Sequence, residues 1–400
     1  MLSFVNRNLL ILFGCQMTFT TGTILLVTIG GIVGYGLAPD PAWATLPVAI
    51  NVVGTALMTI PAALIMQRIG RRLGFMLATL IAASGAALAI YALSVESFFL
   101  FCLATALMGG SLGFSQQFRF AGAESVPADK VSHAVSFILL GSIAGAFLSP
   151  ELVKTSAAAD SASPYTLAFM LVIGLYALAF VALIGLRATS IEDQGASHEP
   201  ARPLGQVFTQ PAFVVAVLAG IMGQGVMTYV MTATPISMNV DEGFSLQTTS
   251  EVIRAHVIAM YLPSLITPLL VAKLGLLRLM TIGVVIMGGT VLIGLAGHHL
   301  MHYWFSLVLL GVGWNFLFVG GTSLLVQTYR SAERFKAQAF NDFGVFGMSA
   351  VASLMAGTVL HNWGWIFLLL SSVPGLLLML AALFWLYRSN SNVQGSQLRI

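Results

Sequence analysis

Hydrophobic residues occur along the chain in long runs that short polar segments separate. Twelve of these runs reach about 18 residues or more with almost no charge, the length that crosses a hydrocarbon core about 30 Å thick. Backbone groups in a bilayer must be satisfied within their own segment, so each run is predicted to be a helix. The predicted spans are Leu9–Gly36, Thr45–Met66, Leu73–Leu93, Phe98–Phe118, Ala134–Val153, Tyr165–Leu186, Pro211–Met238, Val252–Ala272, Leu276–Gly297, Tyr303–Val326, Ala337–Leu360 and Trp365–Tyr387. We therefore predict an all-α integral membrane protein with twelve transmembrane helices.

A polar stretch divides these spans into two groups of six. It covers residues 187–210, "RATSIEDQGASHEPARPLGQVFTQ", and its composition is typical of a flexible linker. A weak internal repeat supports two matching halves, because Arg68-Ile69-Gly70 follows the second span and Lys273-Leu274-Gly275 follows the eighth. Many transporters consist of such duplicated halves, with the substrate site near the membrane midplane. The predicted domains are 1–186, a cytoplasmic linker at 187–210, and 211–400.

The positions of Lys and Arg predict the orientation in the membrane. With both termini in the cytoplasm, all of the 17 basic residues except Lys154 and Arg254 fall in or beside cytoplasmic segments. The net charge of +3 reflects that orientation, and its spread over short segments argues against a nucleic-acid partner. With 8% charged and 58% hydrophobic residues, the composition excludes a soluble fold, which usually has about a quarter of its residues charged.

The chain carries no sequence signature of an enzyme. It has no phosphate-binding glycine loop of the GxxxxGK(S/T) kind, no catalytic triad and no paired carboxylates, so we expect neither catalysis nor direct use of ATP. Cys15 and Cys102 lie in different spans and form no CxxC motif. They are predicted to be small core residues rather than a disulfide or a metal site. No cofactor is predicted.

One loop resembles the signature of a transporter family. "QRIGRR" (Gln67–Arg72), between the second and third spans, is similar to the Gly-x-x-x-Asp-Arg-x-Gly-Arg-Arg/Lys motif of the major facilitator superfamily, with Ala63 and Gln67 in place of the glycine and the aspartate. "GSIAGAFLSP" (Gly141–Pro150) resembles the fifth helix of that superfamily. The resemblance covers the whole chain and implies the major facilitator fold. The change at Gln67 removes the aspartate on which the usual charge contact of the motif depends.

Two methionine-containing pairs predict a soft metal site. Met227 and Met231 lie one turn apart on the seventh span, and His256 and Met260 lie one turn apart on the eighth. In the predicted orientation, both pairs fall in the outer half of adjacent antiparallel helices. Three thioethers and one imidazole form an uncharged ligand set that selects Cu(I) over hard cations. Methionines at this spacing often only pack, but a histidine within the membrane is costly and usually functional.

The paired motifs Met227-x-x-x-Met231 and His256-x-x-x-Met260 also resemble the signature of the CcoA-like copper importers, a bacterial branch of the superfamily. The resemblance implies uptake of copper, as substrate, across the bacterial inner membrane, with copper chaperones as partners and a monomer as the working unit. Relatives in that branch resemble riboflavin carriers. The alternative is therefore a carrier of a neutral or aromatic organic solute such as riboflavin, whose cavity candidates are Gln224, Tyr229 and Asn315.

Two further groups of residues are candidates for capture and gating. His298, His299 and His302 form "HHLMH" on the predicted outer side, where they either capture a metal or form an ordinary interfacial loop. Arg119, Glu124 and Asp342 lie at the predicted cytoplasmic ends of the fourth and eleventh spans, where they either couple to protons or form a charge network that locks one conformation. No Asp, Glu or Lys falls near a midplane, so we predict no strong proton relay and no strongly anionic substrate. These residues leave the driving ion open.

Overall fold

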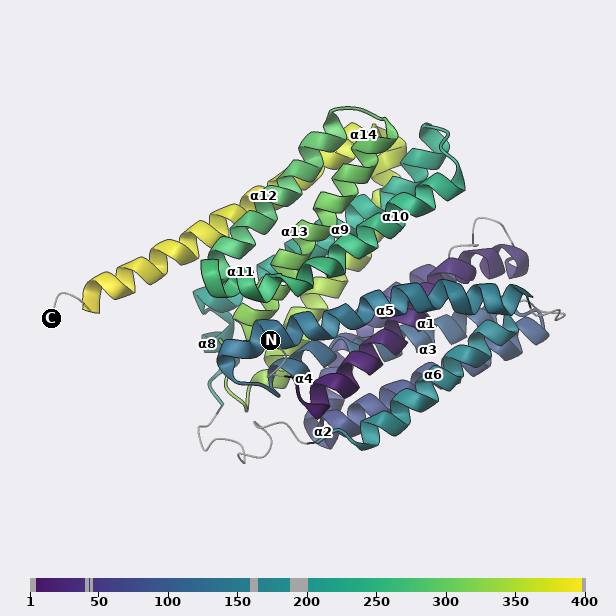
Figure 1. Ribbon diagram of the computed structural model, residues 1–400, viewed down its shortest axis with the longest axis horizontal. Helices are drawn as coiled ribbons and strands as arrows, with labels where there is room; N and C mark the ends of the chain where they lie inside the picture. Colours follow the sequence, from purple (N-terminus) through teal and green to yellow (C-terminus); the bar gives the residue numbers. More distant parts are fainter. Residues whose placement is uncertain (1–4, 40–42, 44–45, 159–164, 188–200, 398–400) are drawn as a thin grey trace. The chain divides into compact units, whose positions relative to one another are not determined.

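A computed structural model of the chain consists of helices and short helical turns (Figure 1). It describes residues 5–39, 43, 46–158, 165–187 and 201–397. The first group of helices is α1 (Arg7–Leu37), α2 (Leu46–Ser94), α3 (Phe98–Ser115), α4 (Phe118–Ala123), α5 (Val131–Ala158) and α6 (Thr166–Ile184). The second group is α8 (Leu204–Phe208), α9 (Pro211–Ile236), α10 (Leu246–Tyr261), α11 (Thr267–Leu274), α12 (Leu276–Leu295), α13 (Leu300–Val326) and α14 (Arg334–Gln397). Short turns are η2 (Ala128–Lys130), η3 (Ser237–Asp241) and η4 (Leu262–Leu265).

Two helices are long enough to contain two spans each. The 49 residues of α2 bend at Gly70, and the 64 residues of α14 bend at Gly364. At 1.5 Å per residue, either helix exceeds twice the hydrocarbon thickness of about 30 Å. Within the described ranges, nine helices are long and apolar enough to cross a membrane, or ten when the bent pair Glu251–Leu265 and Thr267–Leu274 counts as one span. Both α2 and α14 consist of two hydrophobic segments joined at a kink. When each of them is counted as two spans and the bent pair as one, the ten helices correspond to the twelve predicted spans.

The eighth predicted span differs from the expected continuous helix. It is broken into α10, the 3-10 turn η4 and α11, and the two parts are bent by 52°. Pro263 and Pro268 explain the break, because neither has the backbone N–H that would bond the carbonyl four residues earlier. A break within the membrane leaves free carbonyls, which must find other partners.

The chain divides into two compact units. The first comprises Met1–Glu199 together with Gln338–Phe343, the beginning of α14, and the second comprises Pro200–Ala337 and Gly344–Ile400. Residues 188–200 of the predicted linker 187–210 lie outside the described part, and α8 forms near the end of that linker. In the first unit, α1 packs along α5, and α2 packs along α3 and α6.

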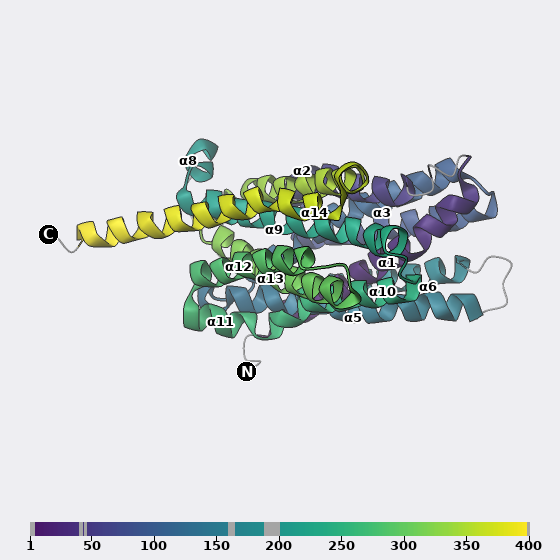
Figure 2. The same cartoon turned by 90° about the horizontal axis from the view of Figure 1, so that it is seen from above.

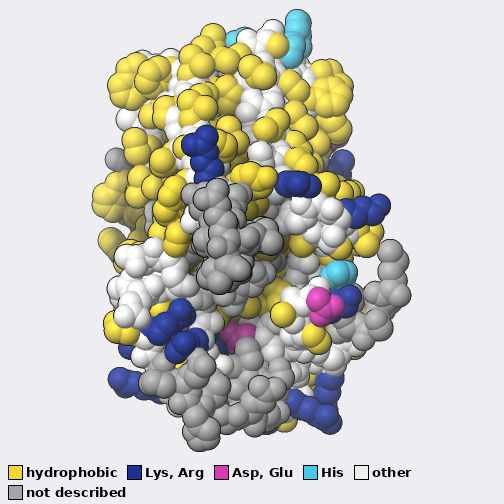
Figure 3. Space-filling model, turned by 90° about the vertical axis from the view of Figure 1, so that its left-hand side faces the viewer, with side chains coloured by type: hydrophobic (Ala, Val, Ile, Leu, Met, Phe, Trp, Pro, Cys, Tyr) yellow, Lys and Arg dark blue, Asp and Glu magenta, His cyan; other side chains and the backbone are white. Residues whose placement is uncertain are grey.

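The second unit is organised around α13. This helix packs against α9, α10 and α12, and α12 and α13 run side by side in both cartoon views (Figure 1, Figure 2). Large hydrophobic side chains such as Leu292, 71% exposed, project from the outer helices. Figure 3 shows many such side chains on the visible face, with scattered Lys and Arg and few acids. An apolar exterior of this kind is expected of a helical protein that faces lipid.

The weak sequence repeat corresponds to a repeated backbone conformation. Gly70 has φ 81° and ψ 162°, and Gly275 has φ 81° and ψ 163°. A positive φ is favourable only for glycine, so both three-residue repeats end on the residue that their turn requires. The second and eighth spans therefore end in the same kind of turn in the two units.

Candidate functional site

An aromatic and amide cluster lies in the second unit, around Trp314 of α13. The indole Nε1 of Trp314 donates a hydrogen bond to Oε1 of Gln224, on α9, at 2.8 Å. The ring of Tyr261, at the end of α10, meets Trp314 edge to face with centroids 5.7 Å apart, and Phe318 stacks on Trp314 at 4.7 Å. Trp314 is buried, whereas Gln224 and Tyr261 are half-buried. Trp314 thus holds one aromatic ring and one amide at a partly accessible surface.

The same amide begins a short polar network across two helices. Nε2 of Gln224 lies 3.4 Å from Oγ1 of Thr228, one turn further along α9. The Thr228 hydroxyl lies 2.8 Å from the Ser349 hydroxyl, on α14. Gln224 and Thr228 keep part of their surface exposed although they belong to an apolar span. Polar groups in such a span are costly unless they face a cavity or a partner. Gln224 and Thr228 have partners in the protein, and their exposed parts can also form hydrogen bonds with a polar solute.

Asn315 clamps the break in the eighth span. Its Nδ2 donates to the Met260 carbonyl at 2.7 Å and lies 2.8 Å from the Ser264 hydroxyl, while its Oδ1 accepts from the Thr267 hydroxyl at 2.8 Å. Asn315 is fully buried. Its amide is therefore occupied by η4 and the adjoining helix ends, and its role in a substrate cavity stays a prediction.

Tyr229 lies in a different environment from Gln224. Its hydroxyl is 3.0 Å from the Ser371 hydroxyl, and its side chain lines a cavity of about 260 Å³ between α9 and α14. Methionines contribute much of that lining, namely Met222, Met348 and Met355. The three predicted cavity residues thus lie in different environments. Gln224 is half-exposed, Asn315 is buried and bonded to the break, and Tyr229 lines a mainly apolar cavity.

The predicted copper ligands lie along the same region of the second unit. Met227, His256 and Met260 are buried and Met231 is half-buried. Nδ1 of His256 is 2.7 Å from the Leu307 carbonyl, and its Nε2 is buried without a hydrogen-bond partner. Among the described residues, α9 and α10 each pack along α13 and share no extended contact with each other. Convergence of the four side chains on one ion stays a prediction.

Other metal-binding groupings are not found in the described residues. They contain no group of three or more His, Cys, Asp and Glu side chains that could hold a metal ion. Cys15 and Cys102 are buried free thiols.

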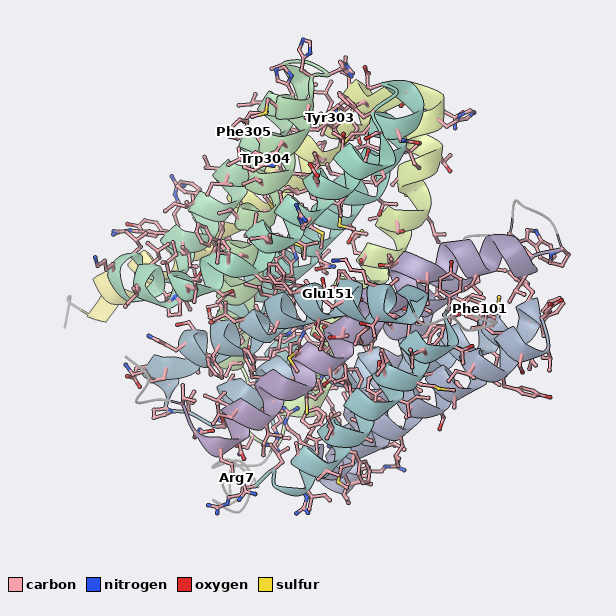
Figure 4. All side chains as sticks on the ribbon, turned by 45° about the vertical axis from the view of Figure 1, so that its right-hand side comes forward. Arg7, Phe101, Glu151, Tyr303, Trp304 and Phe305 are labelled. Carbon is pink, nitrogen blue, oxygen red and sulfur yellow. The ribbon has the colours of Figure 1, made fainter. Side chains whose placement is uncertain are left out.

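The predicted capture histidines form two separate contacts. Nδ1 of His298 is 2.7 Å from Oε1 of Glu242, in the loop that follows η3. His299 and His302 stack with ring centroids 5.8 Å apart, near Tyr303, which is labelled in Figure 4. The Tyr303 hydroxyl is 2.8 Å from that of Ser237. This end of the second unit is tied together by side-chain contacts, and capture of a metal by the histidines stays a prediction.

The gating candidates belong to a buried charge network of the first unit. Arg71, from the "QRIGRR" loop, binds Glu124 through Nε at 2.9 Å and Nη2 at 2.6 Å. Arg119 pairs with Asp342, which also accepts a hydrogen bond from Gln117 at 3.0 Å. Buried charges are tolerated only when paired and hydrogen-bonded. The structure therefore brings Arg119 and Asp342 together and gives Glu124 to Arg71, a loop arginine that the sequence reasoning did not single out.

Sequence reasoning also missed the partners of Gln224. Trp314, Thr228 and Ser349 were not among the candidates, although Trp314 immediately precedes Asn315. A usable signal was present in the Gln-x-x-x-Thr spacing, which places both side chains on one helix face. Ser349 could not be found in this way because it lies 121 residues further along the chain.

Comparison with known proteins identifies both a family and relatives. The Major Facilitator Superfamily model matches residues 10–265. The riboflavin transporter RfnT of Brucella anthropi is 36% identical over 363 residues, which cover 90% of each chain. An uncharacterized MFS-type transporter of Bacillus subtilis, YdeG, is 29% identical over 395 residues, with 94% of this chain and 91% of the relative covered.

Solved structures with the same fold include a fucose transporter and a metal transporter. FucP, in an outward conformation, has a TM-score of 0.76 at 15% identity and covers 95% of this chain and 99% of its own. A bacterial homologue of the iron transporter ferroportin has a TM-score of 0.74 at 14% identity, with 95% and 99% covered. At such identities these likenesses show the fold alone. They confirm the predicted all-α architecture.

Proposed function

The chain belongs to the Major Facilitator Superfamily of secondary transporters, and within it we propose that this protein carries riboflavin, or a flavin closely similar to it, across the bacterial inner membrane. The protein is a multi-pass membrane transporter and not an enzyme. The observation that carries the proposal is the 36% identity to a riboflavin transporter over 90% of both chains. This similarity favours the organic-solute alternative over copper, the main expectation from the sequence.

The aromatic and amide cluster provides a physical reason for this choice. A flavin has a planar aromatic ring system with carbonyl and N–H groups along one edge, and a side chain of hydroxyls. Tyr261 offers a partly exposed ring for stacking, and Gln224 and Thr228 offer hydrogen-bonding groups beside it. Aromatic pairs and hydrogen bonds each contribute about 1 kcal/mol, enough to orient a ligand when several act together.

The charges of the spans are also consistent with a neutral cargo. Arg71, Arg119, Glu124 and Asp342 are buried in the spans or at their ends, and they pair with one another. A substrate with a fixed charge would need an opposite charge in its site, since burying a charge without a partner is costly. Riboflavin has no charge at neutral pH, so its site needs no opposite charge.

The test is uptake of radiolabelled riboflavin by a bacterial strain that can neither synthesise nor import it. We expect wild type to restore uptake and growth on low riboflavin. Gln224→Leu and Tyr261→Ala should each lower uptake by about tenfold, the effect of losing one good interaction. Gln206→Ala, at an exposed glutamine of α8, is the matched control and should transport normally. No riboflavin uptake by wild type at normal membrane expression would refute the proposal.

Copper is retained as a second candidate because of one observation, the buried Nε2 of His256 that has no hydrogen-bond partner. An unpaired imidazole nitrogen with a buried Met260 one turn away suits a soft cation. The contrary observation is that Nδ1 of His256 already bonds the Leu307 carbonyl, as expected of a residue that ties two helices together.

His256→Asn separates the two interpretations. Asparagine keeps a side-chain N–H that can reach the Leu307 carbonyl but lacks the outer nitrogen. If copper is the cargo, uptake of radioactive copper should fall to background in this variant. If the histidine only joins helices, riboflavin uptake should stay within about twofold of wild type, because that hydrogen bond is kept.

A further inference from the structure

The hydrogen bond between Trp314 and Gln224 fixes which way the Gln224 amide points. The indole Nε1–H of Trp314 can donate but cannot accept, so the atom that faces it at 2.8 Å must be the amide oxygen, Oε1. Nε2 of Gln224 is thereby turned away from the indole. Both residues belong to the second unit, on α13 and α9. The amide of Gln224 therefore faces its other surroundings as a donor.

The hydrogen bonds that follow run in the same direction. Oγ1 of Thr228 accepts from Nε2 of Gln224 at 3.4 Å. The Thr228 hydroxyl can then give its own proton to the Ser349 hydroxyl, 2.8 Å away on α14. The direction of each bond is set by the one before it, back to the indole. Hydrogen bonds in such a chain polarise and strengthen one another.

One N–H of Gln224 is left for a solute. An amide nitrogen has two protons, and within the described part of the chain only Thr228 accepts one of them. Gln224 is half-exposed, and so is the nearby ring of Tyr261, which meets Trp314 edge to face. A donor without an acceptor is costly in an apolar span. A solute that brings a hydrogen-bond acceptor to this surface removes that cost.

Helix packing alone does not require this chain of hydrogen bonds. Close contact of α9 with α13 is already provided by Gly321, where an added Cβ would lie 3.0 Å from the Ala216 carbonyl oxygen. Elsewhere on α9, Thr234 returns its hydroxyl to its own helix, to the Val230 carbonyl at 2.8 Å. Thr228 instead directs its hydroxyl across to α14. The chain therefore adds a directed polar surface to helices that already touch.

We infer that Trp314 is a positioning residue that makes this site selective for a hydrogen-bond acceptor of the substrate, an inference that rests on the proposed flavin transport. The indole N–H holds the Gln224 amide so that Nε2 donates to a carbonyl of the substrate. A substrate group that can only donate finds no partner there, because Oε1 faces the indole. For a flavin, the group that fits is one of the two ring carbonyls.

The experiment compares riboflavin with two analogues in which sulfur replaces one or the other ring carbonyl oxygen, as inhibitors of riboflavin uptake in the same cells. Sulfur is a weak hydrogen-bond acceptor. Wild type should therefore bind one of the two analogues about fivefold to tenfold more weakly than riboflavin, the effect of one hydrogen bond. Trp314→Phe keeps an aromatic ring but lacks the N–H, so the amide can turn. In this variant the KM for riboflavin should rise severalfold and the discrimination should fall to about twofold.

Three further variants separate positioning from binding and from packing. Gln224→Met, of similar length, has no N–H and should lose the discrimination although Trp314 is intact. Thr228→Val should keep the discrimination, because the indole still orients the amide. Trp304→Phe is the matched control, since it makes the same substitution near the beginning of α13 (Figure 4), and it should behave like wild type.

The ratio of the inhibition constants of analogue and riboflavin does not depend on the amount of folded carrier, so a weakly expressed variant still gives a result. Riboflavin uptake by wild type without discrimination against either analogue would overturn this inference alone. The same conclusion would follow if Trp314→Phe kept the discrimination of wild type. A wild type that takes up no riboflavin would overturn the proposed function as well.

Discussion

In each unit, a polar side chain and a close glycine join the second span of the half to the fourth, but the polar side chain differs between the units. In the first unit, Nδ2 of Asn51 donates to the Thr105 carbonyl at 3.2 Å, beside the close approach of Gly109. In the second unit, His256 bonds the Leu307 carbonyl beside Gly311, where an added Cβ would lie 2.8 Å from the His256 carbonyl oxygen. Asn51 and His256 therefore have the same structural role: each side chain bonds a backbone carbonyl of the neighbouring helix.

One turn further along, the two units diverge. Gly113 packs against Met58 of the continuous helix α2, with 2.9 Å between an added Cβ and the Met58 backbone. The corresponding residues in the second unit are Asn315 and Pro263, and here the helix is broken. A small residue suffices beside an unbroken helix, but a break requires a side chain that can bond freed carbonyls. At this level the second unit has the ring pair of Tyr261 and Trp314.

The buried ion pair of the first unit should give the largest loss of stability. Glu124→Gln leaves Arg71 without its bidentate carboxylate, although Gln117 and Gln338 still contact it. Breaking a buried pair typically costs about 3–5 kcal/mol, since the remaining charge is uncompensated. Thermal unfolding in detergent should show a clearly lower midpoint than for Lys154→Ala, an exposed control. Equal midpoints would show that the pair contributes little.

Alanine substitutions at the close glycine contacts test whether the helices of the two units are packed equally closely. Gly311→Ala would place a methyl group 2.8 Å from backbone atoms of His256 and Met260, and Gly109→Ala would clash with the Asn51 backbone. Overpacking of this kind costs about 1–3 kcal/mol. We expect both variants to lower the unfolding midpoint, and Gly357→Ala, where a methyl group meets open space, to leave it unchanged. If Gly311→Ala kept the unfolding midpoint of wild type while Gly109→Ala lowered it, the broken helix would be able to move aside for the added methyl group.

Asn315 should combine a moderate loss of stability with a functional effect. Asn315→Leu leaves the Met260 carbonyl and the Thr267 hydroxyl without their partner, at about 1–3 kcal/mol for each buried group. Since Asn315 also bonds the carbonyl of Met260, the residue before Tyr261, its loss should raise the KM for riboflavin. Asn315→Gln, which keeps the amide, should recover part of the loss. A loss of stability with an unchanged KM would confine Asn315 to a structural role.

The smallest effect is expected at the partly exposed ion pair of the second unit, between Arg202 and Glu333. Hydrogen bonds from the Arg202 side chain lower the pKa of Glu333 to about 2. Because folding lowers the pKa of Glu333, its carboxylate stabilises the folded protein fully at any pH above the unfolded-state pKa of about 4.5. This contribution is lost as pH falls from 4.5 toward 2. Glu333→Gln should cost about 1–2 kcal/mol at pH 7, less than Glu124→Gln because water screens Arg202, which is 26% exposed.

Unfolding midpoints measured from pH 7 to pH 3 check this prediction. The difference between wild type and Glu333→Gln should be constant down to about pH 4.5 and shrink below it. A difference that does not change with pH would mean that the negative charge of Glu333 contributes nothing to the stability of the folded protein.

The sequence by itself determined the membrane class, the spans and the family resemblance. Hydropathy and helix length are local properties that add up along a segment, so they can be recognised without knowing what the segment packs against. The repeated turns were also visible, because Gly70 and Gly275 stand in matching tripeptides. Even the Gln-x-x-x-Thr spacing could be found on one helix.

Only the tertiary structure decided which polar groups meet. Ser349 lies 121 residues from Thr228, and Trp314 lies 90 residues from Gln224, distances over which spacing carries no information. For the same reason Arg71 was missed as the partner of Glu124, and the hydrogen bonds of Asn315 to the Met260 carbonyl and the Thr267 hydroxyl were not foreseen. The choice of partner depends on how neighbouring helices pack and where a proline interrupts one of them. That choice determines which groups are left for a substrate.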